Sequence, residues 1–311
     1  MPGKFAQAAL LCAGAAGIWA QTLKFAPVAS ISLPADMIKV QGHSAYIAGA
    51  KAITVIDVSH PEAPKRAGSY TFPDKIWGFR VVGSLVYVAD DLTGLEILDV
   101  SNPNAPVLRG SFKTKGQAKA VVVLGNKAVV VDHMQGLDFF DVSDLSKPVF
   151  QSSLFLDGYA RDIALSGSIA YAVDSPTGFY VLDLAKPGPP DFAASLQAAN
   201  GQVVAAGPKL ACVPGRAGLQ IFDVSDPASP TLASTLKTPG GAPVRVALRG
   251  TRAYAADGRE GLQVVDLSNP TKPTIIGAYK TTDPARDVEV SDSLVFVVAG
   301  SGQLQILRET Q

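Results

Sequence analysis

One short phrase recurs along the whole chain of 311 residues at nearly constant intervals. In each copy two or three Val, Ile, Leu or Phe residues precede an Asp, and in most copies Val-Ser follows it. A seventh copy, near the C-terminus, has Arg308 in place of the Asp. A repeat of this length is typical of solenoids and propellers, in which each unit is one supersecondary structure. The repeat Asp residues are spaced by 40 to 43 positions: Asp57, Asp99, Asp141, Asp183, Asp223 and Asp266.

Each unit contains four strand signals separated by turn signals. In the unit that ends at Asp141, the apolar runs are 106–113, 120–124, 128–131 and 137–142. Gly125-Asn126 separates the second and third runs and is typical of a tight hairpin. Four short antiparallel strands in about 42 residues are typical of a propeller blade. The units therefore predict an all-β protein made of four-stranded antiparallel blades.

The two ends of the chain predict how the ring closes. The last unit has three strand signals, at 287–290, 294–298 and 304–307, and then the chain stops. The N-terminal segment 27–33 matches 106–112, which we assign to the outermost strand of an internal blade. We therefore expect a seven-bladed β-propeller in which the N-terminal strand completes the last blade. Such closure removes the open sheet edge that would otherwise template aggregation.

The first twenty residues have a different character. One positive charge in residues 1–4 precedes the apolar run 5–18, and Ala20 is a small residue suited to cleavage. This pattern predicts a secretory signal peptide at residues 1–20, followed by a single propeller domain at 21–311 with no transmembrane segment. An uncleaved anchor and a lipoprotein acylated at Cys12 are the alternatives. The expected location is secreted or periplasmic, in the cell envelope, and the expected state is a monomer.

The phrase Asp-Val-Ser-x-Pro, preceded by β-branched residues or Leu, resembles the LVIVD-repeat family of bacteria and archaea. The resemblance extends over residues 27–308. It implies an exported or cell-surface propeller and implies no particular activity. Ala185 in the fourth unit and Arg308 in the seventh depart from the phrase.

Features that all units share are expected to build the blade, and features of one or two units are candidates for function. The repeat Asp is expected to accept backbone N–H bonds in the turn that follows it. Four tyrosines are expected to pack between neighbouring blades: Tyr46, Tyr87, Tyr171 and Tyr254.

The candidate binding residues belong to one face. If the strands of a blade are named a to d from the axis outward, the variable d–a and b–c loops surround one mouth of the central channel, where function is expected. The candidates at the start of strand a, at the end of strand b and in the loops are Trp77, Lys119, Arg161, Arg245, Arg286, Asp90, Asp132, Asp174, Asp257 and His133.

Each group of candidates has a structural alternative. The four Asp residues either cap local turns, form salt bridges to Lys119 or Arg161, or bind Ca²⁺, which needs six to eight oxygen ligands. The basic residues either form an anion site or pair with those Asp residues. Trp77 either stacks on a ligand or plugs the channel.

Motifs of catalysis and of cofactor binding are missing from the sequence. The three His residues are too few for a His-rich metal site, and neither a Gly-x-Ser-x-Gly elbow nor a phosphate-binding Gly loop occurs. Lys+Arg and Asp+Glu are equal at 27 each, and no basic stripe indicates nucleic-acid binding.

We therefore expect a non-catalytic interaction module without metal or cofactor, which binds a protein, peptide or glycan of the cell envelope through the channel mouth. The alternative is a hydrolase or lyase that uses His133 and Asp132 at the mouth. A propeller that binds a cofactor or transfers electrons is a third possibility.

Overall fold

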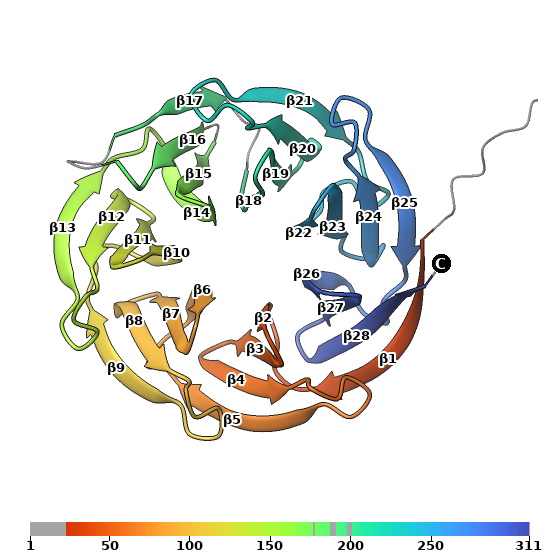
Figure 1. The fold of residues 1–311 in the computed structure, drawn as a ribbon, viewed down its shortest axis with the longest axis horizontal. Coiled ribbons are helices and arrows are strands. Elements are labelled where there is room, and N and C mark those ends of the chain that lie inside the picture. The colour runs from red at the N-terminus through yellow and green to blue at the C-terminus, as the bar shows by residue number, and fades with distance from the viewer. Residues whose placement is uncertain (1–22, 177, 187–190, 198–200, 311) are drawn as a thin grey trace, which may run out of the picture.

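The computed structural model describes residues 23–176, 178–186, 191–197 and 201–310. They form seven four-stranded antiparallel sheets arranged in a ring around a central axis (Figure 1). This architecture confirms the predicted seven-bladed β-propeller. The proposed signal peptide at residues 1–20 lies outside the described residues. No helix in the described ranges is long and apolar enough to cross a membrane.

The two inner strands of each blade line the channel and support its wall. Strands a, from blade 1 to blade 7, are β2 (Met37–Gln41), β6 (Ile76–Val82), β10 (Ala118–Leu124), β14 (Tyr159–Ser166), β18 (Ala205–Ala206), β22 (Arg245–Arg249) and β26 (Ala285–Ser291). Strands b are β3 (Ser44–Gly49), β7 (Leu85–Asp90), β11 (Lys127–Asp132), β15 (Ile169–Ser175), β19 (Leu210–Gly215), β23 (Arg252–Ala256) and β27 (Leu294–Ala299).

The two outer strands carry the repeat phrase and form the circumference. Strands c are β4 (Ala52–Asp57), β8 (Gly94–Asp99), β12 (Gly136–Asp141), β16 (Gly178–Asp183), β20 (Gly218–Asp223), β24 (Leu262–Asp266) and β28 (Gln303–Thr310). Strands d are β5 (Lys65–Thr71), β9 (Val107–Phe112), β13 (Val149–Leu154), β17 (Ala194–Gln197), β21 (Thr231–Leu236), β25 (Thr274–Tyr279) and, in blade 7, β1 (Lys24–Ser32).

The ring closes in the predicted way. Strand β1, red in Figure 1, lies antiparallel to β28 as the outermost strand of blade 7. The register pairs Pro27 with Leu307 and Ile31 with Leu304. The backbone N–H of Leu23 also donates to the carbonyl oxygen of Ile276 in blade 6, at 2.7 Å. Both ends of the described chain therefore contribute strands to blade 7, and their pairing closes the ring.

Apolar side chains fill the space between adjacent blades. One cluster joins Val129 and Leu137 of blade 3 to Ile163 and Ala172 of blade 4. Full burial of one such aliphatic side chain stabilises a fold by about 1.5–3 kcal/mol, so the interfaces between blades supply much of the stability. Four tyrosines of strand b are buried between blades as predicted, namely Tyr46, Tyr87, Tyr171 and Tyr254.

Cys212 lies in the same apolar layer. Its side chain is fully buried, and burial raises the pKa of its thiol to about 12. A thiol that resists ionisation in this way is a poor nucleophile. Cys212 is therefore a small core residue, as the apolar strand around it predicts.

The repeat Asp residues cap the turns after strand c. In the six blades that carry one, a carboxylate oxygen accepts the backbone N–H of the residue two positions later, at 2.8–3.0 Å. This bond lowers the pKa of Asp99, with help from Arg109, to about 2. Arg308, which replaces the Asp in blade 7, pairs instead with Glu62 of blade 1 at 2.8 Å. The repeat Asp is therefore structural, as predicted.

Candidate binding site at the channel mouth

Four of the predicted rim residues are bulge residues. In β10, Ala118 pairs with Asp132 and Ala120 pairs with Val131, which leaves Lys119 as the extra residue. The same interruption occurs in three other inner strands. A bulge bends a strand and re-aims the side chain of the extra residue, and bulges often lie beside binding sites. The four bulge residues are Trp77, Lys119, Arg161 and Arg286.

Trp77 is surrounded by cations. The ammonium groups of Lys75 and Lys119 each lie 3.6 Å from the centroid of the indole ring, within the range of a cation–π contact. The ammonium group of Lys119 also lies 3.9 Å from a carboxylate oxygen of Asp91. Burial lowers the pKa of Lys119, Asp91 opposes this effect, and Arg161 and Lys75 add to it. The indole is therefore part of a basic cluster, and the two lysines already contact its ring.

A glycine allows Trp77 and Lys119 to come together. A Cβ atom at Gly78 would lie 2.6 Å from the carbonyl oxygen of Lys119, which is too close for any other residue. Strand β6 thus approaches the bulge of β10 directly. The indole Nε1 of Trp77 is buried and has no hydrogen-bond partner among the described residues.

The other two bulge residues differ in their partners. Arg286 forms an ion pair with Asp36 across the boundary between blades 7 and 1, at 3.3 Å. Arg161 has no ion pair within the described part of the chain, and its Nε is buried without a hydrogen-bond partner. Arg161 is therefore the bulge residue with most capacity to bind an external group.

The four strand-b Asp residues are clamps between loops. All four are at most 2% exposed, and their carboxylates accept N–H or hydroxyl donors from the d–a loop that precedes their own blade. Three of the d–a loop donors are glycines, and a Cβ at Gly116 would lie 2.2 Å from an oxygen of Asp132. The N–H donors and their acceptors are Asp74 with Asp90 (3.3 Å), Gly116 with Asp132 (2.6 Å), Gly158 with Asp174 (2.7 Å) and Gly240 with Asp257 (2.7 Å).

These bonds favour the reading of the Asp residues as local caps. The ion pair of Lys119 is made with Asp91, and the described residues contain no ion pair between the four buried Asp residues and Lys119 or Arg161. Likewise, no three His, Cys, Asp or Glu residues in the described ranges are placed to hold a metal ion. The carboxylates hold the rim loops and are not presented to the channel mouth.

A second polar layer lies beneath the clamps, and the sequence analysis missed it. In every blade the strand-c residue three positions before the repeat Asp is polar or Tyr. The hydroxyl of Tyr180 donates to Asp174 at 2.9 Å, and burial, with the nearby Asp90, raises the pKa of Glu96 to about 7. A comparison of the units at this position would have found the layer, whose members are Thr54, Glu96, Asp138, Tyr180, Gln220, Gln263 and Gln305.

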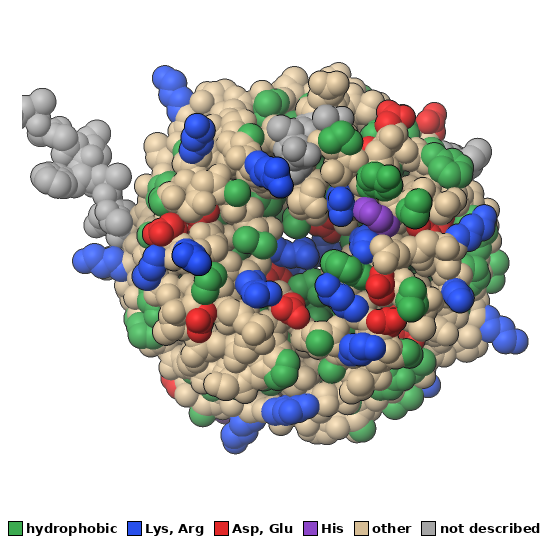
Figure 2. Space-filling view, turned by 180° about the vertical axis from the view of Figure 1, so that it is seen from behind, with side chains coloured by type: hydrophobic (Ala, Val, Ile, Leu, Met, Phe, Trp, Pro, Cys, Tyr) green, Lys and Arg blue, Asp and Glu red, His purple; other side chains and the backbone are tan. Residues whose placement is uncertain are grey.

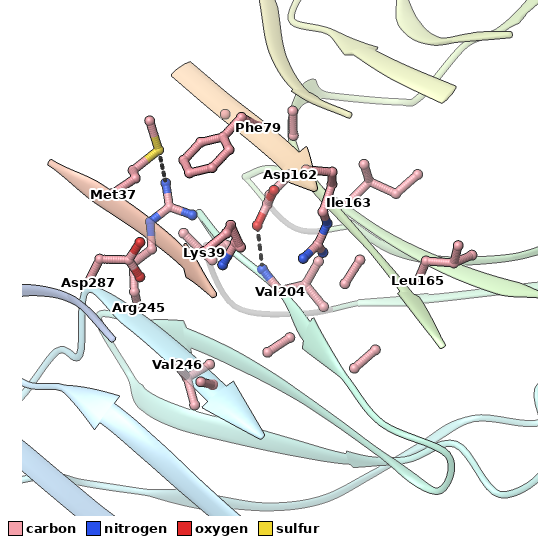
Figure 3. Close-up of a pocket in the computed structure, with 18 of the residues that line it drawn as sticks. Met37, Lys39, Phe79, Asp162, Ile163, Leu165, Val204, Arg245, Val246 and Asp287 are labelled. Carbon is pink, nitrogen blue, oxygen red and sulfur yellow. Dashed lines mark hydrogen bonds between the residues drawn. The ribbon is translucent and has the colours of Figure 1, made fainter. Parts of the chain in front are cut away.

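The channel itself is narrow and charged. A cavity of about 180 Å³ is lined by residues of all seven inner strands (Figure 3). Lys39 pairs with Glu289 at 3.0 Å, and Asp162 accepts the backbone N–H of Val204 at 3.0 Å. Arg245, predicted for the mouth, lies in this wall with its guanidinium 3.7 Å from the sulfur of Met37. Charges of both signs thus fill the channel and pair across blade boundaries.

His133 belongs to the rim. Its Nδ1 lies 3.1 Å from the carbonyl oxygen of Ala160, and its ring stacks on Tyr159 with centroids 5.1 Å apart. A carbonyl only accepts, so Nδ1 carries the hydrogen of this bond. Large apolar side chains lie exposed on the surrounding d–a and b–c loops and the start of β14. We call these residues the apolar rim: Leu92, Met134, Phe155 and Tyr159.

The mouth face combines this apolar rim with basic groups. Figure 2 shows a central hollow with Lys and Arg side chains in and around it. The structure thus brings Trp77, Lys119 and Arg161 of adjacent blades together, places His133 beside them, and separates Arg286 by pairing it with Asp36.

These features define a seven-bladed β-propeller in which basic groups and exposed apolar side chains surround one mouth of the channel. The LVIVD repeat model matches residues 34–72, 75–114, 115–154, 157–197, 202–238 and 240–281, so the chain belongs to the LVIVD repeat family. The six matches coincide with blades 1–6, and blade 7 is the one divided between the two chain ends. No curated protein matches the chain.

Three solved structures with similar folds are 8–11% identical to this chain in sequence. The computationally designed protein Ika8 is 8% identical (TM-score 0.69), with 91% of this chain and 98% of that chain covered. The Cps50 (Swd1) propeller domain of Myceliophteria thermophila is 10% identical (TM-score 0.73; 89% and 99% covered). The Pan2 WD40 domain of Neurospora crassa is 11% identical (TM-score 0.73; 94% and 97% covered). At such low identity these similarities show the fold alone.

Proposed function

We propose that this chain is an exported, non-catalytic interaction module that binds its partner through the mouth face. The observation that carries the proposal is the apolar rim, whose side chains are 54–69% exposed around one mouth of the channel. Exposed apolar groups that gather at one place and have polar neighbours often mark an interaction surface. The N-terminal pattern of residues 1–20 supports export to the cell envelope.

Two further observations support binding over catalysis. The hydrolase or lyase alternative relies on Asp132 and His133. Asp132 is fully buried and accepts the N–H groups of Gly116 and Met134. His133 contacts the carbonyl oxygen of Ala160. Both side chains therefore hold the rim loops together, which is the role expected of a scaffold for a binding surface.

The test is site-specific photo-crosslinking in cells that express the full chain. A benzophenone amino acid replaces Met134 on the apolar rim, and in a matched control it replaces Lys147, which is exposed in the c–d turn of the same blade on the opposite face. We expect one specific adduct from position 134 in the envelope fraction and none from position 147. Phe155→Asp, which places a charge in the apolar rim, should reduce the yield about tenfold or more, a loss of about 1.4 kcal/mol in binding.

Two outcomes would contradict the proposal. One is recovery of the same adduct from both faces, which would indicate non-specific contact. The other is a chain that stays in the cytoplasm or that crosslinks from neither position.

A further inference from the structure

A second cavity lies between the loops of blades 4, 5 and 6 on the mouth face. Its volume is about 540 Å³, which is within the range of small-molecule sites. Two arginines, a serine and a glutamine line it together with apolar residues. The residues that carry the argument are Arg161, Ser175, Gln202, Arg216, Pro243 and Val244.

The charge of this pocket is not balanced. Neither Arg161 nor Arg216 forms an ion pair with any described residue, and no Asp or Glu is among the described residues that line the pocket. The Nε of Arg161 is buried and has no hydrogen-bond partner there. Elsewhere on the same face a bulge arginine does have a counter-ion, since Arg286 pairs with Asp36. The pocket thus contains two positive side chains whose terminal N–H groups have no partner among the described residues.

The surroundings strengthen the positive potential. Lys119 is close enough to Arg161 for the two charges to interact, and Lys75 shares the indole of Trp77 with Lys119. Asp91 is the acidic partner of Lys119, at the outer limit of an ion pair. The whole chain has a net charge of zero, so this cluster is a local feature of the mouth. A concave site lined by one sign of charge attracts a ligand of the opposite sign.

Guanidinium groups have a geometry that favours one class of ligand. Their planar fork donates two parallel N–H bonds to a carboxylate or a phosphate. Ser175 and Gln202 are further polar residues of the lining, and Pro243 and Val244 are apolar ones. A ligand that suits this lining has an oxyanion attached to a body of the size of one sugar or amino-acid residue.

We propose that the pocket between Arg161 and Arg216 binds the carboxylate or phosphate group of such a ligand, which deepens the proposed function because it gives the chemistry that the partner presents. The bulge in β14 directs Arg161 to the rim, and the b–c loop of blade 5 carries Arg216.

The test uses three probes that share a hexose ring and differ in charge. Glucuronate presents a carboxylate, glucose 6-phosphate presents a phosphate, and glucose presents neither. Each probe is titrated into the mature protein and followed by ligand-observed NMR at low salt. We expect binding of at least one anion and none of glucose, with affinity that falls as salt is added because exposed charges are screened. The stronger of the two anions identifies the group.

Variants locate the binding. Arg161→Gln and Arg216→Gln should each weaken the anion about tenfold or more, which corresponds to the loss of charge-assisted hydrogen bonds. Arg286→Gln removes an arginine of the same face that is already paired, and should leave the affinity unchanged. A thermal melt of each variant verifies that it is folded. The proposal is overturned if neither anion binds the wild-type protein, or if the double variant Arg161→Gln, Arg216→Gln binds as well as the wild type.

The result is independent of the crosslinking test, because Met134 is not part of this pocket. Anion binding without an adduct from position 134 would reject the apolar rim and retain the pocket. An adduct without anion binding would retain the interaction module and reject the pocket.

Discussion

Glu96 shows how a single residue departs from a position that its repeats share. Its side chain is 3% exposed, and one carboxylate oxygen is buried with no hydrogen-bond partner in the described structure. Blades 5, 6 and 7 have a neutral amide at the equivalent position, namely Gln220, Gln263 and Gln305. Because a buried charge is costly, burial raises the pKa of the Glu96 carboxyl group from the ordinary value of 4.5 to about 7.

The change Glu96→Gln should therefore alter how stability depends on pH. The pKa of Glu96 is higher in the folded state than in the unfolded state, so its contribution to the free energy of unfolding is greatest at pH values below the unfolded pKa. This contribution declines as the pH rises from about 4.5 to 7. Gln does not titrate, so the variant lacks this decline. Relative to Glu96→Gln, the wild type should lose on the order of 3 kcal/mol between pH 4 and pH 8.

Urea unfolding of both proteins at pH 4, 6 and 8 measures the difference. The change Glu260→Gln, at a half-exposed position where the carboxylate pairs with Lys280, controls for the removal of one negative charge. Parallel stability of the wild type and Glu96→Gln over this range would show that Glu96 is not held protonated by the fold.

At the scale of the element, the inner strands and their loops form a repeated device. In four blades a bulge turns a residue near the start of strand a towards the mouth. In four blades the Asp at the end of strand b ties the d–a loop to the same blade. Asp132 accepts the N–H groups of Gly116 and Met134, which lie in two different loops. The loops that present variable side chains are therefore fixed by residues that repeat among the blades.

Asp132→Asn should loosen these loops without affecting the outer strands. Asn has one acceptor oxygen, and its NH₂ group can only donate, so one of the two backbone N–H groups loses its acceptor. A buried donor without a hydrogen-bond partner costs about 1–3 kcal/mol. We expect this loss in urea unfolding, with faster hydrogen exchange in 113–117 and 133–135 and unchanged exchange in β13.

Asp141→Asn is the matched control, because Asp141 caps the turn on the opposite face of the same blade at Ser143. Its exchange should increase in 143–147 and not at the mouth. Equal effects of both variants on both faces would mean that the blade responds as one unit and that Asp132 has no local role.

At the scale of the whole molecule, the nine residues of β1 close the ring. Their pairing with β28 extends from Lys24 opposite Thr310 to Ser32 opposite Gln303. Val28, Ala29 and Ile31 also pack against the cluster between blades 7 and 1. Loss of β1 removes this packing and exposes the edge of β28.

A chain shortened to begin at Leu33 should therefore melt on the order of 10 °C lower than one shortened to begin at Gln21, for a loss of several kcal/mol. A synthetic peptide of residues 24–32 added in trans should recover part of that difference, whereas a scrambled peptide should not. Calorimetry with increasing peptide measures both effects. Equal melting temperatures for the two chains would show that the ring is stable without its closing strand.

Several features of the site had no signal in the sequence. The bulge at Lys119 depends on how β10 pairs with β11, and a strand pattern does not specify an extra residue. The clamp between Asp132 and Gly116 does have a signal, since an Asp recurs at the end of strand b and a Gly lies sixteen residues before it. The Asp residues were therefore identified from the sequence, whereas their burial was visible only in the structure.

The repeat by itself determined the number of blades, the four strands of each and the closure by residues 27–33. It could do so because alternating apolar residues, Gly turns and the Asp cap act over short distances in the chain. Only the tertiary structure decided that Arg161 and Arg216, in different blades, line one pocket, and that Arg286 is occupied by Asp36. Those relations depend on how seven blades are inclined around an axis, and that geometry arises from packing between blades, which no single repeat encodes.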